Sequence, residues 1–138
     1  MNAFFDSSVL LRKLFGEPDA LAEWPDIDAA YASRILPVEV GRVIDRCRLM
    51  EQIDDKDVAA LHQEARRLLR SIDVLALSEH ILRRAAEAMP TILGTLDSIH
   101  LATALEIGRH IEAPLVLATH DAQFARAARA FGLEVVGV

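Results

Sequence analysis

The chain has 138 residues, a common length for one domain with its own hydrophobic core, and we predict a single domain over residues 1–138. Its single cysteine, Cys47, excludes an internal disulfide and a zinc site built from cysteine pairs. The formal net charge of −6 provides no basic surplus for binding nucleic acid. Most of the 15 basic residues are arginines, however, whose planar side chains suit phosphate, so the charge balance does not exclude nucleic acid as a partner.

No apolar run approaches the ~20 residues that a helix needs to span a bilayer, so we expect no membrane association. The first residues, MNAFFDSS, lack a basic segment followed by a long apolar stretch, and we therefore expect no signal peptide. Together with the single cysteine, these features favour a cytoplasmic protein.

The first predicted strand covers residues 3–5, and Asp6 follows it directly, before a helix that begins at Ser7 and Ser8. Such a junction presents a carboxylate whose rotamer the serine hydroxyls can fix. The same residues are equally consistent with a simple helix cap at Asp6 or Ser7. We then expect a short helix from Glu17 to Trp24, ended by Pro25.

A second strand is predicted over residues 30–36, followed by a helix with Pro37 and Glu39 in its first turn. The helix dipole alone favours an acid at that position, so Glu39 by itself does not indicate a site. We expect the apolar side chains of this helix to face inward, namely those of Val38, Val40, Val43, Ile44 and Cys47.

A long amphipathic helix is predicted over residues 58–70, with its arginines on a solvated face, and a third strand over residues 72–77. Ser78 is expected to cap the next helix, which we end at Pro90. The apolar faces of the helices at 37–50 and 58–70 are candidates for an interface.

The stretch GTLDSIHLATAL, residues 94–105, predicts a buried helix with Asp97 in its first turn, where the helix dipole favours a carboxylate. Taken alone, Asp97 is better explained as a helix cap than as part of a site. Residues 114–118 form the most apolar strand of the chain, which predicts an interior position in the sheet. Asp121 follows this strand, the next helix ends at Gly132, and a last strand covers residues 133–136.

This alternation predicts an α/β fold with a five-stranded parallel sheet sandwiched by helices. In such a sheet the carboxyl ends of the strands meet at one edge, where Asp6, Glu39 and Asp121 belong and to which its helix must bring Asp97. Four bare carboxylates at one edge would repel one another strongly, so the pattern implies a divalent cation. Four unrelated helix caps would have no reason to recur at the same edge.

The segments FFDSSVL, LPVEVGRV, LDSIHLATAL and ATHDAQFARAARAFGLEVV resemble the four acidic motifs of the PIN domain family, and more narrowly those of VapC-type toxins from bacterial toxin–antitoxin pairs. The resemblance spans the whole chain. It implies a PIN-like three-layer α/β/α fold and Mg²⁺- or Mn²⁺-dependent endoribonuclease activity on RNA. It also implies a cognate antitoxin that docks on the toxin, and a homodimer.

Carried over motif by motif, the acids of the family fall on Asp6, Glu39, Asp97 and Asp121. Ser7 or Ser8 takes the hydroxyl position that supports the first acid, and Thr119 matches the small polar residue before the last acid. Hard oxygen ligands select Mg²⁺ or Mn²⁺ over softer metals. We expect Asp6 and Asp97 to be direct ligands, and Glu39 and Asp121 to hold metal-bound water or a second ion. A water molecule activated by the metal would then be the nucleophile.

Two histidines, His100 and His120, flank these acids, and we expect packing or hydrogen bonding from them rather than catalysis. A phosphoacceptor receiver domain is a weaker alternative, because it needs an acid pair after the first strand and a lysine after the last, whereas the lysines here are Lys13 and Lys56. A catalytically silent PIN-like module that acts through a partner protein is more credible, since an intact set of acids does not prove turnover.

Overall fold

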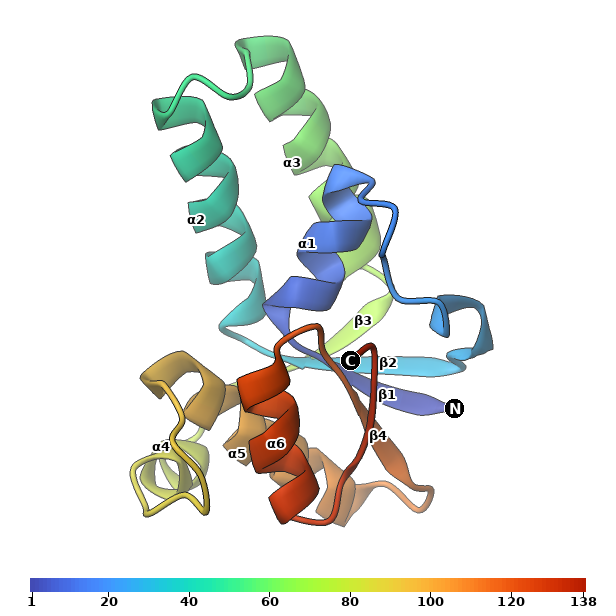
Figure 1. The fold of residues 1–138 in the computed structure, drawn as a ribbon, viewed down its shortest axis with the longest axis vertical. Coiled ribbons are helices and arrows are strands. Elements are labelled where there is room, and N and C mark those ends of the chain that lie inside the picture. Colours follow the sequence, from blue (N-terminus) through green and yellow to red (C-terminus); the bar gives the residue numbers. More distant parts are fainter.

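The structure, a computed structural model, describes residues 1–138 and contains one sheet of five parallel strands in the order β3–β2–β1–β4–β5 (Figure 1). The central strand pairs with a neighbour on each side, and the two outermost strands form the edges. The strands are β1 (Asn2–Phe5), β2 (Ala29–Ser33), β3 (Ile72–Leu75), β4 (Leu115–Ala118) and β5 (Glu134–Val136). Because all pairings are parallel, the strands end on the same side, which we call the carboxyl edge.

Helices cover both faces of the sheet (Figure 1). One face carries α1 (Ser7–Phe15), α2 (Leu36–Leu49) and α3 (Asp55–Leu69). The other carries α4 (Glu79–Ala85), α5 (Thr95–His110) and α6 (Ala122–Ala130). The prediction of a five-stranded parallel sheet sandwiched by helices is therefore confirmed. None of the helices combines the length and the apolar character that a membrane span requires.

Alternation along the strands divides the apolar core into two parts. In β1, Ala3 and Phe5 pack toward α1 and α2, whereas Phe4 packs toward α5 and α6, and all three are essentially inaccessible to solvent. Every residue of β4 is buried, because this strand lies between β1 and β5 and is covered on both faces. The prediction of an interior position for this strand is confirmed.

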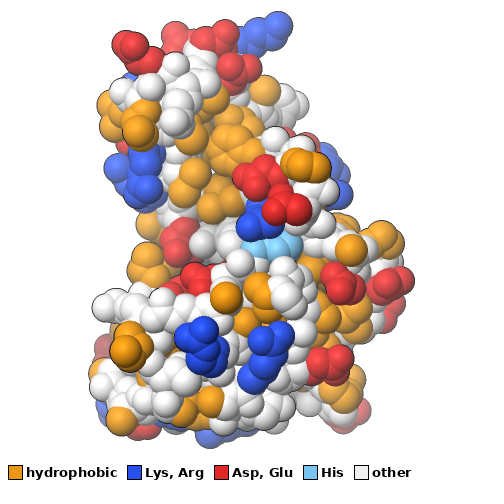
Figure 2. All heavy atoms as spheres, in the orientation of Figure 1, with side chains coloured by type: hydrophobic (Ala, Val, Ile, Leu, Met, Phe, Trp, Pro, Cys, Tyr) orange, Lys and Arg blue, Asp and Glu red, His pale blue; other side chains and the backbone are white.

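The helices α2 and α3 form a hairpin, which we call the arm, that extends away from the sheet (Figure 1). A capping box between Asp54 and Asp57 starts α3 at the far end of the arm. Apolar side chains are exposed along the arm (Figure 2), and Leu49 and Met50 at its tip are 63% and 61% exposed.

Val38 was predicted to face inward, but its side chain is 61% exposed. The buried stripe of α2 consists of Leu36, Val40 and Ile44, which are spaced by four residues along one side of the helix. Val38 lies two residues from Leu36 and from Val40, so the helical period places it on the opposite side. Val43 and Cys47 are partly buried at the margins of the stripe.

The predicted helix from Glu17 to Trp24 is absent. Residues 17–23 form turns, and a short 3₁₀ helix, η1 (Trp24–Asp26), follows them. Pro25 lies inside η1 rather than ending a helix, because a proline in a first turn needs no amide hydrogen bond. The second and third strands also end earlier than predicted, at Ser33 and Leu75, and α4 ends at Ala85, before Pro90.

The last residues of the chain pack against the end of β4. The Thr119 amide donates to the carbonyl oxygen of Val136 at 3.1 Å. Gly137 has a φ of +92°, and a Cβ at this position would lie 2.6 Å from the carbonyl oxygen of Thr119. Only glycine therefore allows this approach.

We predict that Gly137→Ala displaces the last residues from β4 and accelerates hydrogen exchange at the Thr119 amide relative to the β1 amides, as measured by NMR. Gly16→Ala is the control, because Gly16 has a φ of +66° but no neighbouring atom within 4 Å of an added Cβ. We expect that control to cost ~1–2 kcal/mol of stability through backbone strain and to leave Thr119 relatively protected. Equal protection of Thr119 in both variants would contradict the prediction.

Candidate active site

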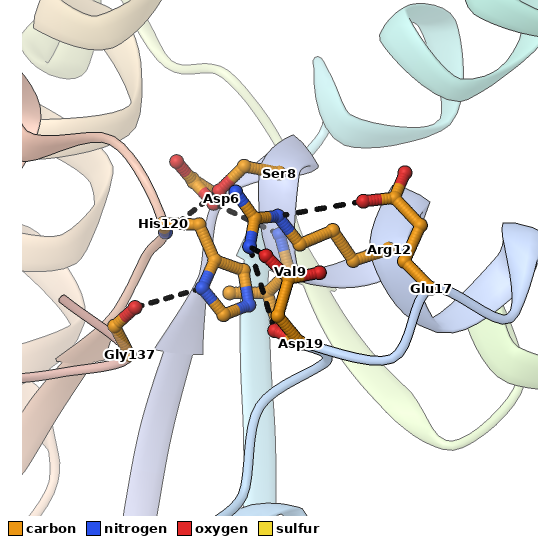
Figure 3. Close-up of polar contacts among 8 residues, drawn as sticks. All are labelled: Asp6, Ser8, Val9, Arg12, Glu17, Asp19, His120 and Gly137. Carbon is orange, nitrogen blue, oxygen red and sulfur yellow. Dashed lines mark hydrogen bonds and ion pairs between the residues drawn. The ribbon is translucent and has the colours of Figure 1, made fainter.

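Asp6 lies at the junction between β1 and α1, where both oxygens of its carboxylate accept hydrogen bonds. Figure 3 draws Ser8 and Val9, the two residues that donate to Oδ1. Oδ1 accepts from the Ser8 hydroxyl at 2.6 Å and from the Val9 amide at 3.3 Å, and Oδ2 accepts from the Thr119 hydroxyl at 2.6 Å. Asp6 therefore does cap α1, but two hydroxyl groups fix it as well. The hydroxyl next to the first acid belongs to Ser8, whereas Ser7 makes no such bond.

The Asp6 side chain is buried, with only 5% of the residue exposed. Burial raises the pKa of this carboxyl group above its ordinary value, because it disfavours the charged form. The hydrogen bonds from Ser8, Thr119 and Val9 act in the opposite direction but do not cancel the effect of burial. A carboxylate in this state gains from any positive charge placed beside it.

The junction between β4 and α6 is tied to the first junction. The Thr119 oxygen that donates to Asp6 also accepts from the Asp121 amide at 2.9 Å, and the His120 amide donates to the Ser8 hydroxyl at 2.9 Å. Asp121 caps α6, because its Oδ1 accepts from the amides of two residues in the first turn. These bonds place Asp6 and Asp121 at neighbouring positions on the carboxyl edge.

His120 turns away from the acids toward the end of the chain. Its Nδ1 lies 2.7 Å from the carbonyl oxygen of Gly137 (Figure 3). On the α1 side of the same view, Arg12 contacts Asp19 and lies 3.7 Å from Glu17. These two contacts hold the turns that follow α1. His120 thus has a hydrogen-bonding role, as predicted for it.

Glu39 lies in the first turn of α2 and contacts His100 of α5. The Nε2 atom of His100 is 2.6 Å from Oε2 of Glu39, and the two side chains are 1% and 16% exposed. The His100 ring packs edge-on against Phe4, with 6.1 Å between the ring centroids. The packing or hydrogen-bonding role predicted for His100 is confirmed, but no pattern in the sequence indicates Glu39 as its partner.

Asp97 lies in the first turn of α5 but caps nothing, since Gly94 occupies the cap position and no side chain bonds the free amides. The cap interpretation of Asp97 is therefore wrong. Burial raises the pKa of Asp97, and the nearby carboxylates of Asp121, Asp6 and Glu39 raise it further against the opposing effect of His100. The three other predicted acids thus lie close enough to Asp97 to raise the pKa of its carboxyl group.

Acidic side chains also appear at the waist of the molecule, between the arm and the helices of the other face (Figure 2). As they stand, no three acidic, histidine or cysteine side chains are grouped closely enough to hold a metal ion. The chemistry of the four acids nevertheless fits a hard divalent cation, because carboxylate oxygens are its preferred ligands and a cation would relieve the repulsion at Asp97. Mg²⁺ in proteins commonly binds one or two carboxylates and keeps several waters, so it needs no closed protein cage.

Comparison with known proteins identifies the family. A model of the PIN domain matches residues 3–130, a range that includes all four acids. The chain belongs to the PIN domain family. This PIN domain is 30% identical to "Ribonuclease VapC46" of Mycobacterium tuberculosis over 133 residues, which cover 96% of this chain and 95% of that relative.

Two solved structures resemble this PIN domain along most of its length. A toxin–antitoxin complex from Klebsiella pneumoniae is 25% identical, with a TM-score of 0.60 over 89% of this chain and 90% of that one. FitAcB from Neisseria gonorrhoeae is 20% identical, with a TM-score of 0.68 over 97% of this chain and 96% of that one. The latter likeness supports the fold.

We predict that Asp97→Asn stabilises the metal-free protein at pH 7, as measured by thermal unfolding in the presence of a chelator. A carboxyl group whose pKa is raised by folding costs stability at pH values above its unfolded pKa, and that cost disappears as the pH falls toward the ordinary value of 3.8. The helix dipole, worth ~0.3–1 kcal/mol at exposed sites, opposes the gain, but we expect burial and the neighbouring carboxylates, which raise the pKa of Asp97, to outweigh it.

Asp45→Asn is a control for which we expect the opposite change in stability at neutral pH. Hydrogen bonds from Arg48 and Arg42 lower the pKa of Asp45, so its charge contributes stability at neutral pH that is lost as the pH falls. We expect no stabilisation in that variant. A fall in stability at pH 7 for Asp97→Asn would contradict the assignment of Asp97 to a cluster of repelling acids.

Proposed function

We propose that this PIN domain is the toxin of a toxin–antitoxin pair, an endoribonuclease that uses Mg²⁺ or Mn²⁺ to hydrolyse RNA phosphodiester bonds. The observation that carries the proposal is the convergence of four carboxylates, from four separate elements, at the carboxyl edge of the sheet. The similarity to a VapC ribonuclease along nearly the whole chain supports the same function.

Within this proposal, Asp6 and Asp97 hold the cation directly, and Glu39 and Asp121 act through water or a second ion. The hydrogen bonds to Asp6 do not prevent this, because the two oxygens of a carboxylate offer about four lone-pair sites between them. When bound, the cation supplies Lewis acidity toward water and toward the phosphoryl oxygens of RNA.

The chain's own residues position the acids and need not attack the phosphate themselves. Ser8 and Thr119 fix the rotamer of Asp6, and the first amides of α6 fix Asp121. The only cysteine, Cys47, follows Glu39 by eight residues on α2, so about two helical turns separate it from that acid. Water is therefore the nucleophile that this arrangement supports.

We also propose a cognate antitoxin as the protein partner. The Klebsiella pneumoniae structure similar to this chain is a toxin–antitoxin complex. The arm offers apolar surface to a partner, since Val38, Leu49 and Met50 are each more than half exposed.

A homodimer is a further prediction of this proposal. Light scattering of the purified protein without antitoxin should give twice the chain mass of 15.2 kDa. Replacing Leu49 and Met50 by serine tests whether the tip of the arm contributes to association. A monomeric mass at all accessible concentrations would contradict the dimer.

A catalytically silent binding module is the second candidate, and one observation favours it. No group of three potential ligands is assembled to hold an ion, and the carboxylate of Glu39 is already paired with His100. A protein of this kind would bind its partners without cleaving RNA, so cleavage distinguishes the two functions.

The purified protein, free of partner, should cleave total cellular RNA in Mg²⁺ or Mn²⁺, and a chelator or Asp6→Asn should reduce cleavage to background. Asp55→Asn is the matched control, because Asp55 is an exposed acid at the far end of the arm and should leave cleavage unchanged. Cleavage that persists in chelator, or in Asp6→Asn, would overturn the proposed site. Folded protein that cleaves no RNA with either metal would favour the silent module.

A further inference from the structure

The contact between Glu39 and His100 joins the two layers of helices across the carboxyl edge. Glu39 belongs to α2 on one face of the sheet, and His100 belongs to α5 on the other (Figure 1). Their side-chain atoms approach to 2.6 Å although the residues are 61 positions apart in the chain. Because His100 is 1% exposed, solvent does not compete for its ring nitrogens.

The surroundings of His100 determine which of its nitrogens donates. Nδ1 is buried and has no hydrogen-bond partner. A proton on Nδ1 would leave a buried donor unsatisfied, whereas a proton on Nε2 can be donated to the Glu39 carboxylate. The imidazole therefore donates through Nε2–H to Oε2 of Glu39.

The ring that makes this bond is itself held in place. Phe4 packs against it edge-on, and Phe124 lies tilted beside it with 6.4 Å between the ring centroids. Both phenylalanines are fully buried, in β1 and in α6. The position of the donor is thus fixed by the core rather than by a mobile surface side chain.

The two acids that cap helices, Asp6 and Asp121, are supported in other ways. Asp6 is fixed by two hydroxyl groups, and Asp121 by the amides of α6. Glu39 has a longer side chain with more rotatable bonds, and its one side-chain hydrogen bond is the bond to His100. Without that bond, repulsion from the neighbouring carboxylates would favour rotamers that point Glu39 toward solvent.

We propose that His100 is a positioning residue that holds the Glu39 carboxylate at the acid cluster, with Oε1 left available for metal-bound water or a second divalent cation. The inference rests on the proposed function, because it concerns the same acids. His100 acts through Glu39 in this arrangement and touches neither the cation nor RNA. Partners that hold metal-binding carboxylates and imidazoles typically affect metal affinity by ~10–100-fold.

Two substitutions separate the hydrogen bond from the packing. His100→Met removes the donor and keeps an unbranched side chain of similar volume in the core. His100→Gln keeps an N–H donor at the position that Nε2 occupies, because its amide nitrogen lies the same number of bonds from Cβ. The matched control is His80→Met, which removes an exposed histidine of α4 that lies 3.3 Å from Glu106 of α5.

Mn²⁺ binding to the metal-free protein, measured by calorimetry in the absence of RNA, provides a readout separate from cleavage. We expect His100→Met to weaken Mn²⁺ binding by ~10-fold or more, and His100→Gln and His80→Met to bind close to wild type. In a Glu39→Gln background, His100→Met should have a much smaller effect, because its influence passes mainly through Glu39.

The inference would be overturned if His100→Met bound Mn²⁺ with wild-type affinity. It would also be overturned if His100→Met caused the same loss of Mn²⁺ affinity in the wild-type and Glu39→Gln backgrounds. If His100→Met does not fold, His100→Asn takes its place, since the asparagine amide is too short to reach Glu39. A wild-type protein that binds no Mn²⁺ and cleaves no RNA would overturn the proposed function together with the inference. If the wild-type protein binds Mn²⁺ and cleaves RNA, and His100→Met binds Mn²⁺ equally well, the inference alone is overturned.

Discussion

Parallel pairing of β1 with its two neighbours is the constraint on which the candidate site depends. Phe5 lies opposite Ala118 in β4, so the residues that follow them, Asp6 and Thr119, emerge side by side and share a hydrogen bond. In an antiparallel sheet these chain ends would point in opposite directions. The sheet therefore brings together groups that are more than a hundred residues apart in the chain.

The site combines local stability with unfavourable electrostatics. Two of its acids complete helix starts and so contribute to folding, whereas Asp97 caps nothing and is repelled by its neighbours. Such an arrangement is consistent with selection for binding a cation rather than for stability alone. The electrostatic cost of the repelling acids is offset by packing in the core, where β1 and β4 are almost entirely buried.

Local signals were sufficient for most of the fold. Strand–acid–helix junctions located Asp6 and Asp121, and the apolar run of β4 indicated an interior strand. The pairing of Glu39 with His100 could not be predicted, because it depends on how two helices on opposite faces meet, and no local pattern encodes that. The predicted helix before β2 is absent for a related reason, because Leu21 of this segment packs into the core, and burial in the core can override local helix preference.

The two edge strands have a consequence for how copies of the protein can meet. β3 and β5 contain four and three residues, and each includes an acidic residue, Asp73 and Glu134. Short, charged edges are poor templates for strand addition, so the sheet resists growth into intermolecular β-structure. Association between copies is thereby directed toward helical surfaces, and aggregation through the sheet is disfavoured even when the protein is abundant.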